Sequence, residues 1–166
     1  MRKVAIWSVV VVVTLARGSG PAAGAADAPS LAVSPFDAKQ AKLHQEAWSK
    51  HLGQPVELTN SIGMKLAFIP RGKFLMGSPD AIYPKPSSCE TPQHWVFINP
   101  FYLGVYEVTQ AQYQKVVGSN PSKFKGESLP VEFVDWNDAQ AFCKRLSELP
   151  AERAAGRTYR LPNEPQ

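Results

Sequence analysis

The sequence predicts an α+β fold, rich in loops and built from short helices and strands. Proline (15 residues) and glycine (11) are frequent for a chain of 166 residues, and both interrupt regular structure. Apolar residues make up 44% of the chain, which is enough for a hydrophobic core and argues against disorder. The length suits one domain rather than two.

The first 26 residues have the pattern of a cleaved signal peptide. Arg2 and Lys3 form a basic start, residues 4–15 are an almost unbroken apolar run, and small residues follow up to Ala25 and Ala26. A membrane anchor is the alternative, but this run is well short of the roughly 20 residues that span a bilayer. No cysteine lies near the expected cleavage site, so a lipid anchor is not expected. We therefore expect export to the periplasm or the extracellular space, with no membrane attachment after cleavage.

The formal charge of +4 does not indicate a nucleic-acid partner. Three of the 18 basic residues lie in the expected leader, which has no acidic residue, so 15 basic and 14 acidic residues remain. The remaining basic residues are scattered, whereas nucleic-acid binding requires them to cluster.

Residues 27–55 are expected to form a linker and one helix. Residues 27–36 are rich in proline, alanine and serine, and residues 37–51 favour a helix that stops at Gly53. A modest apolar stripe along this helix consists of Ala41, Leu43, Ala47, Trp48 and Leu52.

Four short strands are expected next. They cover residues 64–69, 73–76, 94–98 and 101–105. Pro70 and Gly72 provide turn chemistry between the first two strands. The proline-rich residues 77–92 are expected to be irregular.

Thr109 is expected to cap a short helix. Gln112 stands at the capping-box position, and Gly118 can end the helix.

The last helix is the best defined in the sequence. Asp135 or Asn137 can cap it, and Pro150 follows its end. Its apolar stripe consists of Ala139, Phe142, Cys143, Leu146 and Leu149. Residues 158–161 are expected to form a short strand.

Several short phrases occur in the order and spacing of one known family. They are NSIGMK (60–65), IPRGKFLMGS (69–78), ETPQH (90–94), PFYLGVYEVT (100–109), NPS (120–122), LPVE (129–132), WNDA (136–139) and YRLP (159–162). Together they resemble the sulfatase-modifying-factor domain of formylglycine-generating enzymes. The resemblance implies a loop-rich mixed fold related to C-type lectins over residues 56–166.

The resemblance also implies a chemistry. Enzymes of the family oxidise one cysteine of a sulfatase polypeptide to formylglycine with molecular oxygen. A cysteine pair near the family's C-terminal end binds Cu(I), a soft metal that suits thiolates, and a calcium site lies in the later half.

This chain departs from the family pattern at its end. The family continues with Thr-Glu-Ala-Glu-Trp-Glu-Tyr where this chain reads Asn163-Glu164-Pro165-Gln166, and only Glu164 fits. We therefore expect a domain that is incomplete at the C-terminus, holds no catalytic, cofactor-binding or metal residues, and is inactive alone. One alternative is an exported, lectin-like binding module for a peptide, a glycan or a cell-envelope partner. A product without any function is another.

We expect no catalytic or metal-binding role for the cysteines and histidines. Cys143 lies on the apolar face of its helix, which indicates a buried structural or free thiol. The resemblance implies a structural cysteine here, with its partner in the later half of the domain that this chain lacks. Cys89 is expected to be exposed and open to oxidation. The sequence does not say whether the two pair, and nothing in it brings them together on copper. His44 and His51 are expected on the surface, seven residues apart and too distant to chelate one ion, and His94 is expected to pack or to hydrogen-bond.

Two further groups of residues, one aromatic and one acidic, could each form a functional site. The aromatic residues Trp95, Phe97, Phe101, Tyr102, Tyr106 and Tyr113 suggest a sugar- or peptide-binding platform, but core packing is favoured. Glu132, Asp135 and Asp138 suggest a carboxylate site, but their place at a helix start favours capping.

Overall fold

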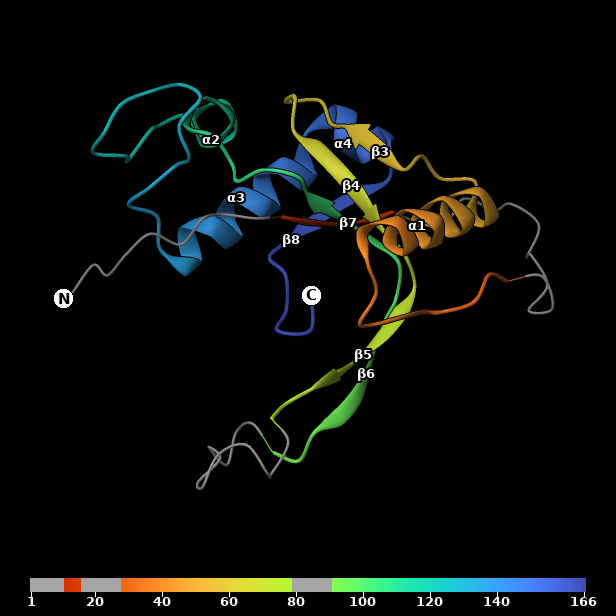
Figure 1. Cartoon of the computed structure of the whole chain (residues 1–166). Coiled ribbons are helices and arrows are strands. Elements are labelled where there is room, and N and C mark those ends of the chain that lie inside the picture. Colours follow the sequence, from red (N-terminus) through yellow and green to blue (C-terminus); the bar gives the residue numbers. More distant parts are fainter. Residues whose placement is uncertain (1–10, 16–27, 79–90) are drawn as a thin grey trace. The chain divides into compact units, whose positions relative to one another are not determined.

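A computed structural model describes residues 11–15, 28–78 and 91–166 of the chain. Its short helices and strands confirm the predicted α+β class and separate into two compact units. The strands of the first unit are β1 (Val12–Leu15), β3 (Glu57–Thr59), β4 (Lys65–Ile69), β7 (Phe101–Gly104) and β8 (Arg157–Arg160). Its helices are α2 (Gln110–Val117), α3 (Trp136–Glu148) and α4 (Pro150–Ala154). The second unit contains β2 (Ala32–Val33), α1 (Ala38–Leu52), β5 (Gly72–Met76) and β6 (His94–Ile98) (Figure 1).

The first unit is built on a five-stranded sheet in the order β3-β4-β7-β1-β8 (Figure 1). β1 is antiparallel to both of its neighbours, and Val13 stands opposite Tyr102 on one side and Tyr159 on the other. The side chains of Val11, Val12 and Val13 are fully buried. This strand belongs to the predicted leader, so it is present only while the chain retains that segment. Its valines suit a strand as well as a leader, and the signal peptide stays a prediction.

The core of the first unit lies between this sheet and its helices. Phe68 on β4 meets Tyr102 on β7 edge to face, with ring centroids 5.4 Å apart. Tyr113 on α2 stacks on Phe142 on α3 at the same centroid distance, and the rings are 10° from parallel. Aromatic pairs of this kind add to the stabilisation that burial itself provides.

The predicted helix caps of this unit are confirmed. Thr109 and Gln112 form a capping box at the start of α2, and Gly118 ends that helix with a φ of +90°. Asp135, rather than Asn137, caps α3.

α4 is an element that the sequence interpretation missed. Pro150 was expected only to follow the end of a helix, and α3 does end at Glu148. Proline also suits the first position of a helix, because its missing N–H would have no partner there. Pro150 therefore begins α4, whose chain then leads into β8.

The second unit contains a three-stranded sheet in the order β2-β5-β6. β5 and β6 pair antiparallel, and β2 adds to β5 in parallel from a segment that the sequence analysis treated as a linker. A Cβ atom on Gly72 would lie 2.6 Å from the carbonyl oxygen of Ala32. Glycine at this position therefore permits the close approach of β2, in addition to the predicted turn.

The helix of the second unit begins and ends as predicted, but its buried face differs. Asp37 caps α1, and Gly53 ends it with a φ of +63°. Trp48 is buried, and its Nε1 donates to the Ser30 carbonyl at 2.9 Å. Leu43 and Leu52 of the predicted stripe are exposed, so that part of the prediction is wrong. None of the helices in the described residues is long and apolar enough to cross a bilayer.

Candidate functional site

Cys143 is a buried free thiol, as the sequence indicated. Its side chain is 2% exposed on the inner face of α3, and burial raises the pKa of the thiol to about 12. The thiolate is therefore scarce at neutral pH, which makes the sulfur a poor nucleophile and a poor metal ligand. Cys89 lies outside the described residues.

The residues that the structure describes do not fit the copper chemistry of the family. A Cu(I) dithiolate needs two accessible thiolates, whereas these residues offer one buried thiol. Nor do they include a group of three or more His, Cys, Asp or Glu side chains that could hold a metal ion.

We expect Cys143 to resist alkylation in the folded chain. In a Cys89→Ser variant, which retains one thiol, iodoacetamide at pH 8 should modify Cys143 at least tenfold more slowly than in urea, because burial keeps the thiol protonated and covered. Mass spectrometry of quenched samples measures the two rates. Similar rates in the two conditions would contradict the buried position of Cys143.

Asp135 and Asp138 cap α3, as the capping interpretation requires, whereas Glu132 does not cap the helix. Asp135 accepts a hydrogen bond from the main-chain N–H of Asp138, and Asp138 accepts one from that of Asp135. The Glu132 carboxylate accepts from the main-chain N–H groups of Lys123 and Phe124 at 2.9 and 2.8 Å. These carboxylates are occupied by the chain itself.

Two of the histidines pack against aromatic rings, and the third forms a hydrogen bond. His44 lies beside Phe36 and His51 beside Trp48, with ring centroids 5.8 and 5.6 Å apart. Both are half-buried rather than simply on the surface. Nδ1 of His94 lies 3.0 Å from the Pro92 carbonyl oxygen, which confirms a hydrogen-bonding role.

The aromatic residues divide between core and surface. Phe101, Tyr102 and Tyr113 are buried, as the core-packing interpretation requires. The exposed members of the group are Trp95, Phe97 and Tyr106, at 46, 64 and 68% exposure. Core packing is therefore wrong for these three residues, and a binding platform made of all six is wrong as well. The exposed rings are the remaining candidates for ligand contact.

Two of the exposed rings belong to the β5–β6 pair of the second unit. Trp95 and Phe97 alternate along β6 and so share one face, where they stand opposite Leu75 and Lys73. The Lys73 ammonium lies 4.5 Å from the centroid of the Trp95 ring, at cation–π distance.

The third exposed ring, Tyr106, lines a cleft of about 640 Å³ in the first unit. The cleft adjoins the contact between β4 and β7, where the N–H of Val105 donates to the Lys65 carbonyl at 2.9 Å. The loop before α2, the start of α2 and the loop that precedes Val131 complete the lining. The lining residues are Gly63, Met64, Lys65, Gly104, Val105, Tyr106, Glu107, Thr109, Gln112, Ser128 and Pro130.

Gln110 fixes the loop that carries Ser128 and Pro130. Its buried side-chain amide donates to the carbonyls of Phe124 and Pro130 and accepts from the Asn120 side chain and the Gly126 N–H. The amide thus makes four hydrogen bonds at the start of α2, which holds this wall of the cleft in place. This role could not be predicted from the sequence, because partners 10 to 20 residues away leave no local pattern.

The cleft lining combines apolar, charged and polar groups. Val105 and Tyr106 offer exposed apolar surface, and Lys65 and Glu107 supply charges of opposite sign. Its lining also contains the hydroxyls of Thr109 and Ser128 and the amide of Gln112.

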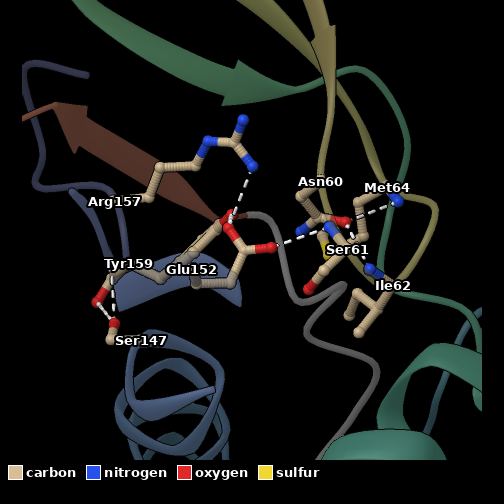
Figure 2. Close-up of polar contacts among 8 residues, drawn as sticks. All are labelled: Asn60, Ser61, Ile62, Met64, Ser147, Glu152, Arg157 and Tyr159. Atoms are coloured by element: carbon tan, nitrogen blue, oxygen red, sulfur yellow. Dashed lines mark hydrogen bonds and ion pairs between the residues drawn. The ribbon is translucent and has the colours of Figure 1, made fainter. Parts of the chain in front are cut away.

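A buried carboxylate holds the turn that leads into this cleft (Figure 2). Glu152 on α4 is fully buried, and its Oε1 accepts from the Ser61 N–H at 2.7 Å. Its Oε2 accepts from the Tyr159 hydroxyl at 2.5 Å and from Nη1 of Arg157 at 3.2 Å. Burial alone would raise the pKa of this carboxyl, but the hydrogen bonds from Ser61, Tyr159 and Arg157 outweigh it and lower the pKa.

The same cluster shapes the turn between β3 and β4 (Figure 2). Oδ1 of Asn60 accepts from the N–H groups of Ile62 and Met64 at 3.1 and 2.8 Å. Glu152 holds the next residue, Ser61, and the turn then delivers Gly63 and Met64 to the cleft. No local pattern in the sequence marks Glu152, because the fold alone brings its partners together.

The chain matches a known protein family. Residues 53–166 match the sulfatase-modifying factor enzyme 1-like domain, which is more than half of the chain. The chain belongs to the sulfatase-modifying-factor family. The family assignment made from the sequence phrases is thereby confirmed.

Individual proteins resemble parts of this sulfatase-modifying-factor chain. Fifty-two residues are 54% identical to the chaperone protein LppX of Paenibacillus barcinonensis, and the match spans 31% of the chain and 19% of the relative's length. The solved structure of PvdO from Pseudomonas aeruginosa is 25% identical with a TM-score of 0.44, over 55% of this chain and 43% of that one. Treponema denticola variable protein 1 is 32% identical with a TM-score of 0.46, over 57 and 35% of the two chains.

Proposed function

We propose that this chain is an exported, non-catalytic member of the sulfatase-modifying-factor family that binds a short stretch of polypeptide in the cleft beside Tyr106. The observation that carries the proposal is the cleft itself. Its volume of about 640 Å³ lies in the range of ligand-binding pockets, and its lining combines an exposed ring with convergent polar groups.

A polypeptide ligand suits the cleft chemically. Tyr106 can cover an apolar side chain of the ligand, while Lys65 and Glu107 can pair with its charged or main-chain groups. The enzymes of the family act on sulfatase polypeptides, and the relative with 54% local identity is named a chaperone protein. Both facts favour a polypeptide over a glycan or another cell-envelope component.

Export follows from the N-terminal pattern. A basic start, an apolar run and small residues are what the export machinery recognises. The site of action is then the periplasm or the extracellular space, where an exported sulfatase polypeptide is an available partner.

Replacing Tyr106 by alanine is expected to weaken peptide binding at least tenfold. The ring is 68% exposed in the cleft, so its removal takes away ligand contact at little cost to the fold. Fluorescence anisotropy with a labelled, cysteine-containing sulfatase-type peptide measures the Kd.

Phe124→Ala is the matched control for this variant. Phe124 is 66% exposed and does not line the cleft, so its loss should change the Kd less than twofold. An equal effect of the two variants, or no binding by the unmodified chain, would contradict the proposal.

Formylglycine generation is the second candidate, and family membership favours it. It requires Cu(I) and reactive thiolates, which the described residues do not provide, since Cys143 is buried and protonated. Conversion of a peptide cysteine to an aldehyde, trapped with a hydrazine probe, would establish this candidate in place of the first.

A further inference from the structure

The apolar segment that forms β1 occupies a position between two strands that do not otherwise meet. β7 and β8 both run antiparallel to it, so they are parallel to each other and joined only through β1 (Figure 1). Val12 stands opposite Leu103 on one side and Arg160 on the other. We call this position, between Phe101–Gly104 and Arg157–Arg160, the strand slot.

The strand slot is covered on both faces along residues 11–13. Successive side chains of a strand point to opposite faces, and Val11, Val12 and Val13 are all fully buried. Tyr102 and Tyr159, which flank the slot at Val13, are buried as well. Removal of the leader would leave two rows of main-chain groups and an apolar gap inside the sheet, which a folded protein fills with another strand.

We propose that the strand slot is a binding site for an extended, apolar segment of another polypeptide, and that Val12–Leu15 occupies it until the leader is removed. The burial of the side chains of β1 indicates which types of side chain the slot accepts. Strand addition supplies affinity through main-chain hydrogen bonds and specificity through alternate side chains. The inference relies on the proposed function for the removal of the leader and for the class of partner. Of the residues that define the strand slot, Gly104 alone also lines the cleft.

The register sets the sequence that the slot accepts. Positions equivalent to Val11, Val12 and Val13 must be apolar and of valine size, because each is fully enclosed. The position of Thr14 tolerates polar or charged residues, because that side chain is exposed. At the start of the slot the N–H of Gly104 donates to the Val11 carbonyl at 3.0 Å.

The test uses the full chain with a protease site inserted after residue 20. The cut chain is unfolded in urea and refolded with an excess of a labelled peptide that carries residues 9–16 and added lysines for solubility. Native mass spectrometry then counts the bound peptides, and anisotropy measures their affinity. Two variant peptides serve as probes, one with Val12→Asp and one with Thr14→Asp.

We expect one labelled peptide per chain in place of the leader fragment. The V12D peptide should bind at least a hundredfold more weakly, and the T14D peptide within about threefold of the parent, because one position is enclosed and the other exposed. Equal binding of the two variants, or no peptide bound while the leader fragment is released, would overturn the inference. A dimer that exchanges its own leader segments in preference to the peptide would overturn it as well.

Tyr106→Ala separates this inference from the proposed function. A chain with this substitution should take up the slot peptide as the unmodified chain does, because Tyr106 lies on the cleft. Loss of sulfatase-peptide binding with slot uptake intact is the expected pattern. Loss of both at once would overturn the assignment of two separate sites.

Discussion

Replacing Glu152 by alanine is expected to destabilise the first unit by about 3–5 kcal/mol, the range for breaking a buried charge pair from one side. The substitution leaves Arg157 without its carboxylate and removes the acceptor of the Ser61 N–H and the Tyr159 hydroxyl. Urea unfolding followed by tryptophan fluorescence gives the free energy of unfolding.

Glu148→Ala is the control for this substitution. Glu148 is an exposed acid near the end of α3, so its removal should change the free energy by less than about 0.5 kcal/mol. If both variants lost the same small amount, the buried cluster would not be a source of stability.

The charge of Glu152 also determines how the free energy of unfolding depends on pH. Its pKa in the folded chain lies below the ordinary value of 4.5, so its contribution is fully present above that value and is lost as the pH falls through the folded pKa. A Glu152→Gln variant should therefore lose less stability than the unmodified chain between pH 5 and the acid limit of folding.

Replacing Phe142 by alanine is expected to cost a similar amount, about 3–5 kcal/mol, through the loss of buried area and the cavity left behind. Phe142 is fully buried on α3 and stacks on Tyr113 of α2, so the substitution separates two helices of the first unit. The same urea titration measures the loss.

Phe124→Ala again provides a matched comparison. The two residues are chemically identical, but Phe124 is 66% exposed, so its removal should leave the free energy of unfolding within about 0.5 kcal/mol. A small effect at both positions would contradict the packing described for α2 and α3.

Local patterns in the sequence predicted most of the elements, because the interactions that begin and end them are local. The capping boxes of α1 and α2 join residues three apart, and Gly53 and Gly118 adopt the left-handed conformation that glycine favours. β4 to β7 follow short apolar runs between turn residues, whereas β8, Arg157–Arg160, does not. The family assignment likewise rested on short phrases in order.

Long-range pairing produced the features that the sequence did not predict. β2 and β3 are two and three residues long, and each exists because another strand lies beside it. The residues of β1 were interpreted as part of a leader, because an apolar run alone does not distinguish a signal peptide from a buried strand. The cleft and the Glu152 cluster join segments that are up to 91 residues apart.

The aromatic residues show where composition fails as a guide to a site. Phe101 and Tyr106 lie in one short phrase, yet the first is 4% exposed and the second 68%. Their roles depend on the face of the sheet and on the loop that each occupies, which only the fold determines. The cleft could therefore be located only after β4, β7 and the loop before α2 were placed.

One mixture tests the central claim, that the chain binds a polypeptide without oxidising it. The purified chain, Cu(I), oxygen and a labelled sulfatase-type cysteine peptide are incubated together, and anisotropy and intact-peptide mass spectrometry are recorded on the same sample. We predict a bound peptide whose cysteine is unchanged. Formylglycine in the peptide would contradict the account and assign the chain to the enzymes of its family.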